Sequence, residues 1–326
     1  MTAMRPIKGE PSIVTIGEAL FRLSVPEGER LEDARHVAMG VAGSEANVAV
    51  ALANLGMASI WISRLPDTRL GRRVADDIAR FGVDVSHVVW TEEGRVGLFF
   101  VELSVPPRPA QVIYDRRDTA AAAMASSDVP RNVIESAALL HLSGITPALS
   151  DTTRQMAVEV VGWARREGTL VSIDVNHRSL LWTADVAREV LLELCESVDL
   201  LIATSADARD IFGVDGKNRG VAEHLAEVTG VARVVVTRGA NGVVWNEPDG
   251  GGELPVVPAK VVDRIGAGDA FAAGVINGFV EGDLEQGVQL GLVLAALKLG
   301  IRGDQLRLSP ADLRLISEGV LREVVR

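Results

Sequence analysis

The sequence predicts an α/β fold with a mostly parallel central sheet and a small additional sheet. Short β-branched runs alternate along the chain with longer segments of helical periodicity, which is typical of β-α-β units. Several helical segments end at a glycine and are followed by an apolar strand. Residues 96–117 break this rhythm, because two extended stretches around a Pro-rich turn predict a hairpin.

The predicted elements follow the rhythm from the first strand onward. The first strand ends at Gly17, and the helix that begins near Ser44 ends at Gly56. No low-complexity linker or internal repeat interrupts the pattern, so we expect one domain over residues 1–326. The predicted strands are residues 12–17, 58–65, 170–176, 200–205 and 231–239, and the predicted helices are residues 44–56, 70–82 and 151–168.

The hairpin has a predicted neighbour near the N-terminus, where residues 19–28 are also extended. Antiparallel strands inserted into a parallel α/β domain suggest a small sheet that projects from it and closes over a site. We therefore expect a lid built from residues 18–38 and 96–117. Its apolar residues Val101 and Leu103 are expected to be exposed, which would suit pairing of two lids in a homo-oligomer.

The composition restricts the class of partner. The 44 acidic and 33 basic residues give a net charge of −11, so no basic face for nucleic acid is expected. The single cysteine, Cys195, cannot form an internal disulfide, and no cysteine–histidine cluster has zinc-site spacing, which indicates the cytoplasm. Residues 1–20 lack the apolar core of a signal peptide and no apolar run is long enough to span a membrane, so we expect no membrane partner.

The segment Val261–Gly274 contains the most informative motif. Gly266, Ala267 and Gly268 stand directly before an acid, Asp269, and the chain continues as an apolar, Ala-rich run typical of a buried helix. Glycine is costly inside a helix but suits a turn in which the backbone approaches a ligand closely. Because a helix N-terminus presents unpaired N–H groups and a partial positive charge, the motif predicts an anion site.

Two common phosphate-binding motifs do not fit this segment. A dinucleotide-binding fingerprint would need a small residue in place of Phe271, and the chain contains no Walker motif. Phosphoryl transfer needs donors for the charge on the phosphate and an acceptor for the proton of the attacking hydroxyl, which the three amides and Asp269 would supply. The same residues also fit a glycine-rich turn in which Asp269 only caps the helix, and the motif by itself leaves both interpretations open.

Two separated motifs resemble the PfkB family of ribokinase-like sugar kinases. Residues 263–271 are similar to its C-terminal D-T-x-G-A-G-D-x-F signature. Residues 41–56 are similar to its Gly-rich turn and helix, with Gly43 and Asn47 in place and Ala42 where the first glycine is usual. The resemblance covers nearly the whole chain and implies a ribokinase-like three-layer α/β/α fold with a β-sheet lid.

The resemblance also implies a reaction, in which ATP with Mg²⁺ phosphorylates a small-molecule sugar. Asp269 would accept the proton of the attacking hydroxyl, and the amides of Gly266, Ala267 and Gly268 would hold the charge that develops on the phosphate. Closure of the lid over the sugar would exclude water from the reaction.

Within that family the sequence most resembles the 2-keto-3-deoxygluconate kinases, in residues 112–122, 139–150, 172–182 and 296–304. Arginine pairs with carboxylates through two parallel hydrogen bonds, so the arginines in these stretches suit a sugar acid better than a neutral sugar. The sugar-binding residues that the resemblance implies are Gly43, Asn47, Phe99, Tyr114, Arg116, Arg178 and Asp304.

These residues have different implied places. Tyr114 and Arg116 would reach the sugar from the lid, Arg178 would lie between the sugar and the phosphates, and Asp304 would close on the sugar hydroxyls. Phe99 stands where the family often has tyrosine, which removes one hydrogen bond to the substrate.

The nucleotide side follows from a third similarity. Residues 234–245 resemble the family's strand and Gly-rich turn beside the nucleotide. The nucleotide-binding residues implied are Asn176, Thr237, Gly239, Gly242 and Gly268.

Two departures concern the ions. The family's usual Asn-x-x-Glu near the metal is replaced here by Thr204-Ser205-Ala206-Asp207. The resemblance therefore implies a metal-site role for Asp207 alone, as a contact to Mg²⁺ through water. Arg264 and Ile265 replace a common Thr-Thr pair near a monovalent cation, which leaves activation by K⁺ open.

The sequence therefore predicts an ATP-dependent kinase for the terminal primary hydroxyl of 2-keto-3-deoxygluconate. A kinase for fructose, another ketose or a nucleoside is an alternative, since the shared motifs bind ATP and do not choose the acceptor. A non-catalytic, sugar-responsive regulatory protein on the same fold is a second alternative.

Overall fold

The computed structural model describes residues 12–103, 108–216 and 219–317. The Pro-rich tip of the predicted hairpin and the start of the N-terminal stretch lie outside these ranges. Within them, no helix has both the length and the apolar character needed to cross a membrane.

A central sheet of eight strands organises the described residues, in the order β14-β13-β12-β11-β10-β9-β1-β4. The run from β12 to β4 is parallel, while β13 and β14 join antiparallel at one edge. The strands are β1 (Ser12–Ile16), β4 (Ala58–Ile62), β9 (Leu139–Ser143), β10 (Leu170–Asp174), β11 (Leu200–Thr204), β12 (Arg233–Thr237), β13 (Val243–Glu247) and β14 (Gly250–Leu254). The five strands predicted from β-branched runs are confirmed.

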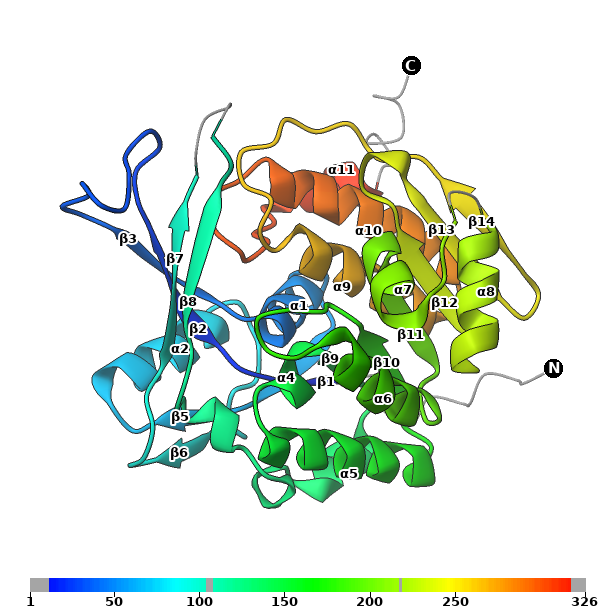
Figure 1. Cartoon of the computed structure of the whole chain (residues 1–326), viewed down its shortest axis with the longest axis horizontal. Helices are drawn as coiled ribbons and strands as arrows, with labels where there is room; N and C mark the ends of the chain where they lie inside the picture. Colours follow the sequence, from blue (N-terminus) through cyan, green and yellow to red (C-terminus); the bar gives the residue numbers. More distant parts are fainter. Residues whose placement is uncertain (1–11, 104–107, 217–218, 318–326) are drawn as a thin grey trace.

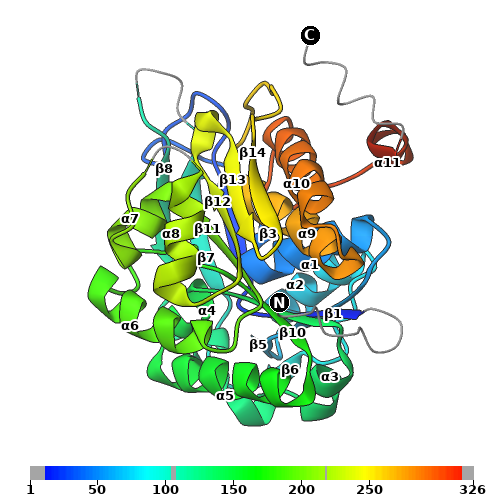
Figure 2. The ribbon, with the colours of Figure 1, turned by 90° about the vertical axis from the view of Figure 1, so that its right-hand side faces the viewer.

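Helices cover both faces of this sheet (Figure 2). Strand β1 shows how its residues alternate between the faces, since Ile13 packs with α1, α9 and α10 while Val14 packs on the side of α5 and α6. The helices of the first face are α1 (Ser44–Asn54), α9 (Ala267–Glu281) and α10 (Leu284–Leu299), and those of the second are α3 (Arg131–Ser136), α5 (Asp151–Glu167), α6 (Ala184–Cys195), α7 (Ser205–Phe212) and α8 (Gly220–Thr229). The predicted three-layer α/β/α fold is confirmed.

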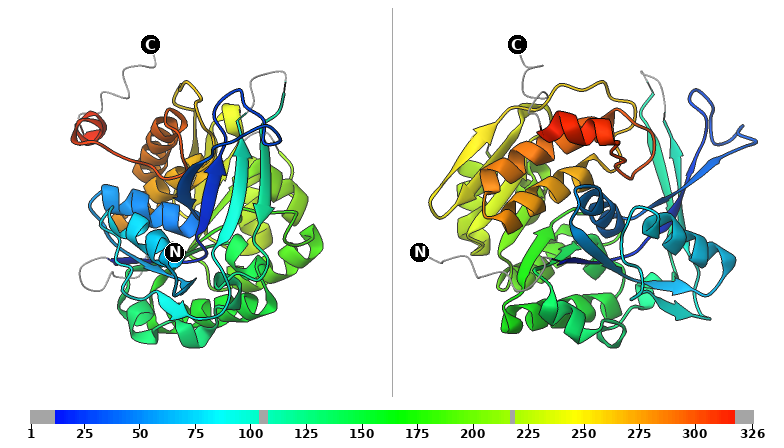
Figure 3. Two further views of the ribbon diagram at one scale, coloured as in Figure 1. Left: turned by 90° about the vertical axis from the view of Figure 1, so that its left-hand side faces the viewer. Right: turned by 180° about the vertical axis from the view of Figure 1, so that it is seen from behind.

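A small sheet of four strands stands beside the main domain (Figures 1 and 3), in the order β3-β2-β7-β8. The predicted hairpin is its β7–β8 pair, and the predicted N-terminal neighbour is β2, which pairs with β7 in parallel. These strands are β2 (Leu20–Ser24), β3 (Ala38–Ala42), β7 (Gly97–Glu102) and β8 (Gln111–Asp115). The remaining elements are α2 (Arg69–Ala79), α4 (Ile145–Ala148), α11 (Pro310–Ser317), β5 (Arg64–Pro66) and β6 (Val89–Thr91).

The expected exposure of Val101 and Leu103 is wrong. Val101 is 0% exposed and packs with Leu20, Ala42 and Phe99, while Leu103 is half-buried against the same cluster. Alternate residues of a strand share a face, so Val101 must point to the same side of β7 as Phe99, toward the main domain.

Helices α9 and α10 form an antiparallel pair with glycine at the contact (Figure 1). A Cβ atom on Gly278 would lie 2.3 Å from the Cα of Gly287, and one on Gly274 would lie 2.4 Å from the backbone nitrogen of Gly291. The absence of side chains therefore lets the two backbones touch, and the N-terminus of α9 lies at the same end of the pair as the C-terminus of α10.

Candidate active site

The carboxyl ends of the parallel strands and the small sheet enclose a cavity of about 540 Å³. This edge is where open parallel sheets hold their ligands. The predicted site residues that line the cavity are Gly43, Asn47, Phe99, Tyr114, Arg116, Asn176, Arg178, Asp207, Gly266, Gly268, Asp269 and Asp304. Ala267, Thr237, Gly239 and Gly242 are not among the lining residues.

Asp269 lies in the first turn of α9 and is held by the first turn of α1. Its Oδ1 accepts a hydrogen bond from the Ser44 hydroxyl at 2.8 Å, and its Oδ2 accepts one from the Asn47 amide at 2.7 Å. Asn176 in turn donates to the Ser44 oxygen at 3.0 Å. Burial raises the pKa of Asp269, while these hydrogen bonds and the charges of Arg178 and Lys298 oppose the shift. The carboxylate is therefore oriented toward the cavity and made a better proton acceptor.

Ser44 was missed by the sequence reasoning. The sequence did contain a signal for Ser44, because it is the first helical residue after Gly43. A side chain in the first turn of one helix can face the N-terminus of another helix at the same edge of the sheet.

The N-terminus of α9 supplies the backbone donors of the predicted anion site. Helix N-termini leave their first N–H groups without helical partners. The amide of Ala267 donates to the carbonyl of Arg264 at 3.3 Å, while the first bond within the helix is that of Ala270 to Gly266. In the described part of the chain, no backbone hydrogen bond engages the amides of Gly268 and Asp269. Since the Gly266 amide has no hydrogen-bond partner among the described residues either, the amides of Gly266, Gly268 and Asp269 are left to meet an anion.

Gly266 is required at its position for two reasons. Its φ of +87° lies in the left-handed region, and a Cβ atom there would lie 2.0 Å from the carbonyl oxygen of Asp304. Gly268 has open space at the corresponding position. The turn of Gly266 thus packs directly on the Asp304 loop.

We expect Gly266→Ala to lower the free energy of unfolding by about 1–3 kcal/mol and to reduce kcat, since the turn must move to admit the methyl group. Gly268→Ala is the matched control for stability, because its methyl group meets no atom. Denaturant unfolding checks the difference. Equal stability of the two variants would show that the close approach of Gly266 to Asp304 is not required.

The sugar side of the cavity combines two aromatic rings with a buried ion pair. Phe99 and Tyr114 stack with ring centroids 5.4 Å apart, and the Arg116 guanidinium lies 4.1 Å from the Tyr114 centroid. Arg116 also donates to Oε1 of Glu18 at 2.8 Å. Burial raises the pKa of Glu18, and the charges of Arg116 and Arg178 oppose the shift. Glu18 was missed, although an acid directly after a buried strand is a recognisable signal.

Arg178 follows β10 and lies exposed at the rim of the cavity. No described residue forms an ion pair with its guanidinium. Of the three arginines that line the cavity, Arg116 is already paired, whereas Arg178 and Arg264 form no ion pair with a described residue and can meet an external anion.

Asp304 lines the cavity but is held on its far side by an arginine of the small sheet. Arg22 on β2 forms ion pairs with both Asp304 and Asp263, the latter at 2.6 Å. All three side chains are buried. Burial raises the pKa of Asp304 to about 6, and the Arg22 charge opposes the shift. The ion pairs join the small sheet to the loops around Gly266.

The nucleotide side is marked by carboxylates. Burial and the negative charges of Asp207 and Asp269 raise the pKa of Asp174 well above its ordinary value, and Arg178 opposes this. One oxygen of Asp207 accepts hydrogen bonds from the backbone and hydroxyl of Thr204, which caps α7. Among the described residues, no group of three or more acid, histidine or cysteine side chains could hold a metal ion without help from a ligand.

Thr237, Gly239 and Gly242 lie at the end of β12, next to Thr204 in the sheet. The positive φ values of Gly239 and Gly242 shape this turn, and a Cβ atom on Gly242 would lie 2.1 Å from the carbonyl of Leu254. The turn is thus formed as predicted, outside the cavity itself.

Glu45 is a buried acid behind Ser44. Its Oε1 accepts hydrogen bonds from the backbone and hydroxyl of Ser143 and from the hydroxyl of Thr146, at 2.7–2.9 Å. Its Oε2 has no partner within the described residues and lies against Gly17. Burial raises the pKa of Glu45 to about 7, and the hydrogen bonds oppose the shift.

This pKa predicts a pH dependence of stability. Because the pKa of Glu45 is raised from 4.5 to about 7 on folding, the folded protein favours the protonated carboxyl. The resulting stabilisation is complete below pH 4.5 and is lost as the pH rises through 7. Relative to Glu45→Gln, the wild-type free energy of unfolding should therefore fall over this window, by about 3 kcal/mol at most. Denaturant unfolding at pH values on both sides of the window measures the difference. A constant difference would show that Glu45 does not titrate there.

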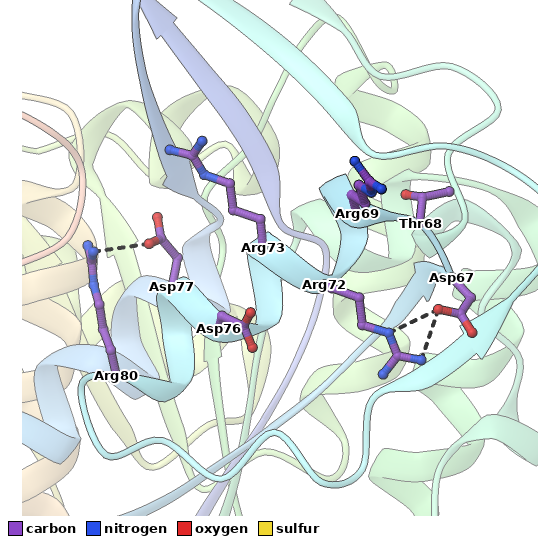
Figure 4. A pocket seen from close by; sticks show the side chains of 8 residues that line it. All are labelled: Asp67, Thr68, Arg69, Arg72, Arg73, Asp76, Asp77 and Arg80. Atoms are coloured by element: carbon purple, nitrogen blue, oxygen red, sulfur yellow. Dashed lines mark hydrogen bonds and ion pairs between the residues drawn. The ribbon is translucent and has the colours of Figure 1, made fainter.

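A second hollow lies along α2, away from the sheet edge (Figure 4). Arg72 pairs with Asp67 at 2.9 Å and Arg80 pairs with Asp77 at 3.0 Å, so these charges already neutralise one another on the surface. This hollow has none of the buried carboxylates of the cavity and is not our candidate for the active site.

Comparisons with known proteins agree with this geometry. The sequence profile described as pfkB family carbohydrate kinase matches residues 10–311. A 2-dehydro-3-deoxygalactonokinase of Haloferax volcanii is 38% identical over 308 residues, which are 94% of this chain and 96% of the relative. A 2-dehydro-3-deoxygluconokinase of Thermoproteus tenax is 32% identical over 306 residues, which are 92% of this chain and 91% of the relative.

Solved structures give the same picture. The crystal structure of a 2-dehydro-3-deoxygluconokinase from Thermotoga maritima matches with a TM-score of 0.87 at 29% identity and covers 96% of this chain and 100% of that one. The family expected from the two sequence motifs is thereby confirmed. The profile match, the three-layer fold and an oriented acid at a helix N-terminus lead to one conclusion: the chain belongs to the pfkB family of carbohydrate kinases and is an ATP-dependent sugar kinase.

Proposed function

We propose that the protein transfers the γ-phosphoryl group of ATP to the terminal primary hydroxyl of 2-keto-3-deoxygluconate, also called 2-dehydro-3-deoxygluconate. The observation that carries this proposal is the Asp269 carboxylate, held by Ser44 and Asn47 and directed into a cavity that also contains Arg116 and Arg178. The names of the relatives and of the similar crystal structure support a 2-keto-3-deoxy sugar acid as the acceptor.

In the proposed reaction Asp269 takes the proton of the sugar hydroxyl. The hydroxyl oxygen forms a bond to the γ-phosphorus while the bond from that phosphorus to the β–γ bridging oxygen breaks, and ADP leaves. The free amides of Gly268 and Asp269, together with the N-terminal end of α9, hold the charge on the transferred group. Each of these groups is already in place, so little reorganisation is needed during transfer.

The sugar acid would be recognised by charge and by ring packing. Arg178 would bind its carboxylate, and Arg116, Tyr114 and Phe99 would contact its carbon chain and hydroxyls from the small sheet. Asn47, Gly43 and Asp304 complete the proposed sugar-binding surface. We propose that the small sheet acts as a lid that excludes water, since both Arg116 and Arg22 connect it to the main domain.

The cavity fits a magnesium–nucleotide complex. Burial is the main cause of the raised pKa of Asp174, and the negative charges of Asp207 and Asp269 add to it, so a divalent cation between these acids and the phosphates would relieve the repulsion that Asp174 meets. Bound Mg²⁺ supplies positive charge to the phosphate oxygens. Asp207 would contact it through water, and Asn176, Thr237, Gly239 and Gly242 would adjoin the nucleotide.

The test is ADP release from ATP and Mg²⁺ with a panel of acceptors: 2-keto-3-deoxygluconate, 2-keto-3-deoxygalactonate, gluconate, fructose, ribose and adenosine. We expect the highest kcat/KM for a 2-keto-3-deoxy acid. A preference for a neutral sugar or a nucleoside would overturn the proposed acceptor and leave the kinase reaction standing. ADP release with none of the acceptors would favour a sugar-responsive regulatory protein.

The two epimers in this panel deserve separate measurement. The Haloferax volcanii relative is named for the galactonate form and the Thermoproteus tenax relative for the gluconate form. The second candidate function is therefore phosphorylation of 2-keto-3-deoxygalactonate, or of both epimers. The ratio of the two kcat/KM values decides between them.

A cytoplasmic location and a homo-oligomer formed through the small sheet stay predictions. Because Val101 is buried, it cannot form the oligomer contact. Other apolar residues of the small sheet, Met39 and Ile113, are exposed and could form it instead. Light scattering measures the oligomeric state, and a monomer would remove the second prediction.

A further inference from the structure

Lys298 is a buried cation that the proposed reaction does not use. It lies in the last turn of α10 and its side chain is 0% exposed. Its ammonium group donates hydrogen bonds to the backbone carbonyls of Asp263 at 3.3 Å and of Ile301 at 3.4 Å. A buried charge is costly unless it is paired and hydrogen-bonded, so its surroundings should show what it is for.

The groups around Lys298 offset part of the cost of burying its positive charge. The C-terminal end of α10 contributes the partial negative charge of its helix dipole. Burial lowers the pKa of Lys298, and the carboxylates of Asp263 and Asp304 oppose this shift. Arg22 forms ion pairs with the same two acids from the small sheet. Two cations and two anions therefore form one buried cluster.

The two carbonyls that bind Lys298 belong to the two loops that shape the anion site. One loop, residues 263–266, leads into α9, and the other, residues 301–304, packs directly against Gly266. Asp263 connects them, because its carboxylate accepts hydrogen bonds from the amides of Ile265 and Gly303, both at 3.1 Å. A cation that binds both loops fixes the position of the amides at the start of α9.

In proteins, backbone carbonyl oxygens can bind a free monovalent cation such as K⁺. The carbonyls of Asp263 and Ile301 bind the ammonium group of Lys298 in a comparable way. We propose that the Lys298 ammonium is a built-in monovalent cation that holds the two loops of the anion site in place, so that phosphoryl transfer needs no added potassium or sodium. This inference rests on the proposed kinase reaction. Lys298 does not line the cavity and acts through the residue 263–268 turn, so it is a positioning residue.

The test is chemical rescue of Lys298→Ala. This variant removes the charge and leaves space beside the two carbonyls. We expect kcat to fall about ten- to 100-fold, with a smaller change in KM for ATP, because a displaced anion site mainly weakens the transition state. Ammonium or potassium ions should restore most of kcat, whereas choline at equal ionic strength should not. Wild-type kcat should be the same in all these salts.

Lys298→Met is the matched control. Its side chain fills similar space without charge, so kcat should fall and no salt should restore it. Thermal unfolding gives a readout that does not depend on activity: ammonium or potassium should raise the Tm of Lys298→Ala above its value in choline and leave wild-type Tm unchanged.

Several results would overturn the inference. They are a wild-type rate that rises several-fold with potassium, a Lys298→Met variant with wild-type kcat, or a Lys298→Ala variant that no small cation restores in rate or in Tm. If Lys298→Ala does not fold in any salt, the wild-type salt series and Lys298→Met decide. If wild-type protein phosphorylates no acceptor, the proposed function fails, and the Tm measurements still test the cation site.

Discussion

Asp269→Asn should reduce kcat by about 10³-fold, within the range typical of a lost general base. The asparagine can keep its place, because its amide can donate to the Ser44 oxygen while its carbonyl accepts from Asn47, as Asp269 now does. Affinity for ATP should therefore remain close to that of the wild type. Steady-state kinetics and nucleotide titration by calorimetry measure the two effects.

The control for this variant is Asp67→Asn, which removes an exposed acid in the hollow along α2 and should leave kcat unchanged. Retention of most of the wild-type rate by Asp269→Asn would return the motif to the simpler interpretation, in which the acid only caps α9.

Arg178→Ala should lower kcat/KM for a sugar acid by about ten- to 100-fold, the loss expected for one hydrogen-bonded charge contact. The effect should fall mainly on KM and should be small for a neutral sugar. Arg178 forms no ion pair with a described residue, but its charge opposes the raised pKa of Glu18, Asp174 and Asp269, so the neutral sugar is the control that separates this general effect from the loss of a carboxylate contact. Arg116→Ala would be a poorer test, since it would leave Glu18 unpaired.

Arg178→Lys separates charge from geometry in the same assay. Lysine keeps the charge but cannot form two parallel hydrogen bonds, so an intermediate loss is expected. Equal losses for acidic and neutral acceptors would contradict a contact between Arg178 and the substrate carboxylate.

Sequence predicted the parts of this site that depend on neighbours along the chain. The glycines before Asp269 must form a turn, and the Ala-rich run after it must form a buried helix, whatever the rest of the fold does. Parallel strands then bring Asp174, Thr204 and Thr237 to the same edge of the sheet.

The contacts that hold Asp269 and the turn before it could not be predicted in this way. Arg22 and Asp304 are 282 positions apart, and Ser44 and Asp269 are 225 positions apart. Such pairs depend on how the two sheets and the helices α1 and α9 come together. Lys298 is recognisable in the sequence as a single charge in the apolar run of α10. Its partners could not be predicted, because they are backbone carbonyls, which every residue type has.

One error was avoidable from local geometry. Phe99 and Val101 are two residues apart on a strand, so they cannot face the sugar and the solvent respectively. Strand periodicity applied to the whole of β7 would have predicted that Val101 is buried.

The glycine contact between α9 and α10 has a consequence for engineering. Replacement of helical glycine by alanine is a common way to raise thermal stability. At Gly278 or Gly274 the added methyl group would meet the backbone of the neighbouring helix. It would push apart the pair whose common end carries both Asp269 and Lys298. Libraries designed for heat tolerance should leave these glycines unchanged.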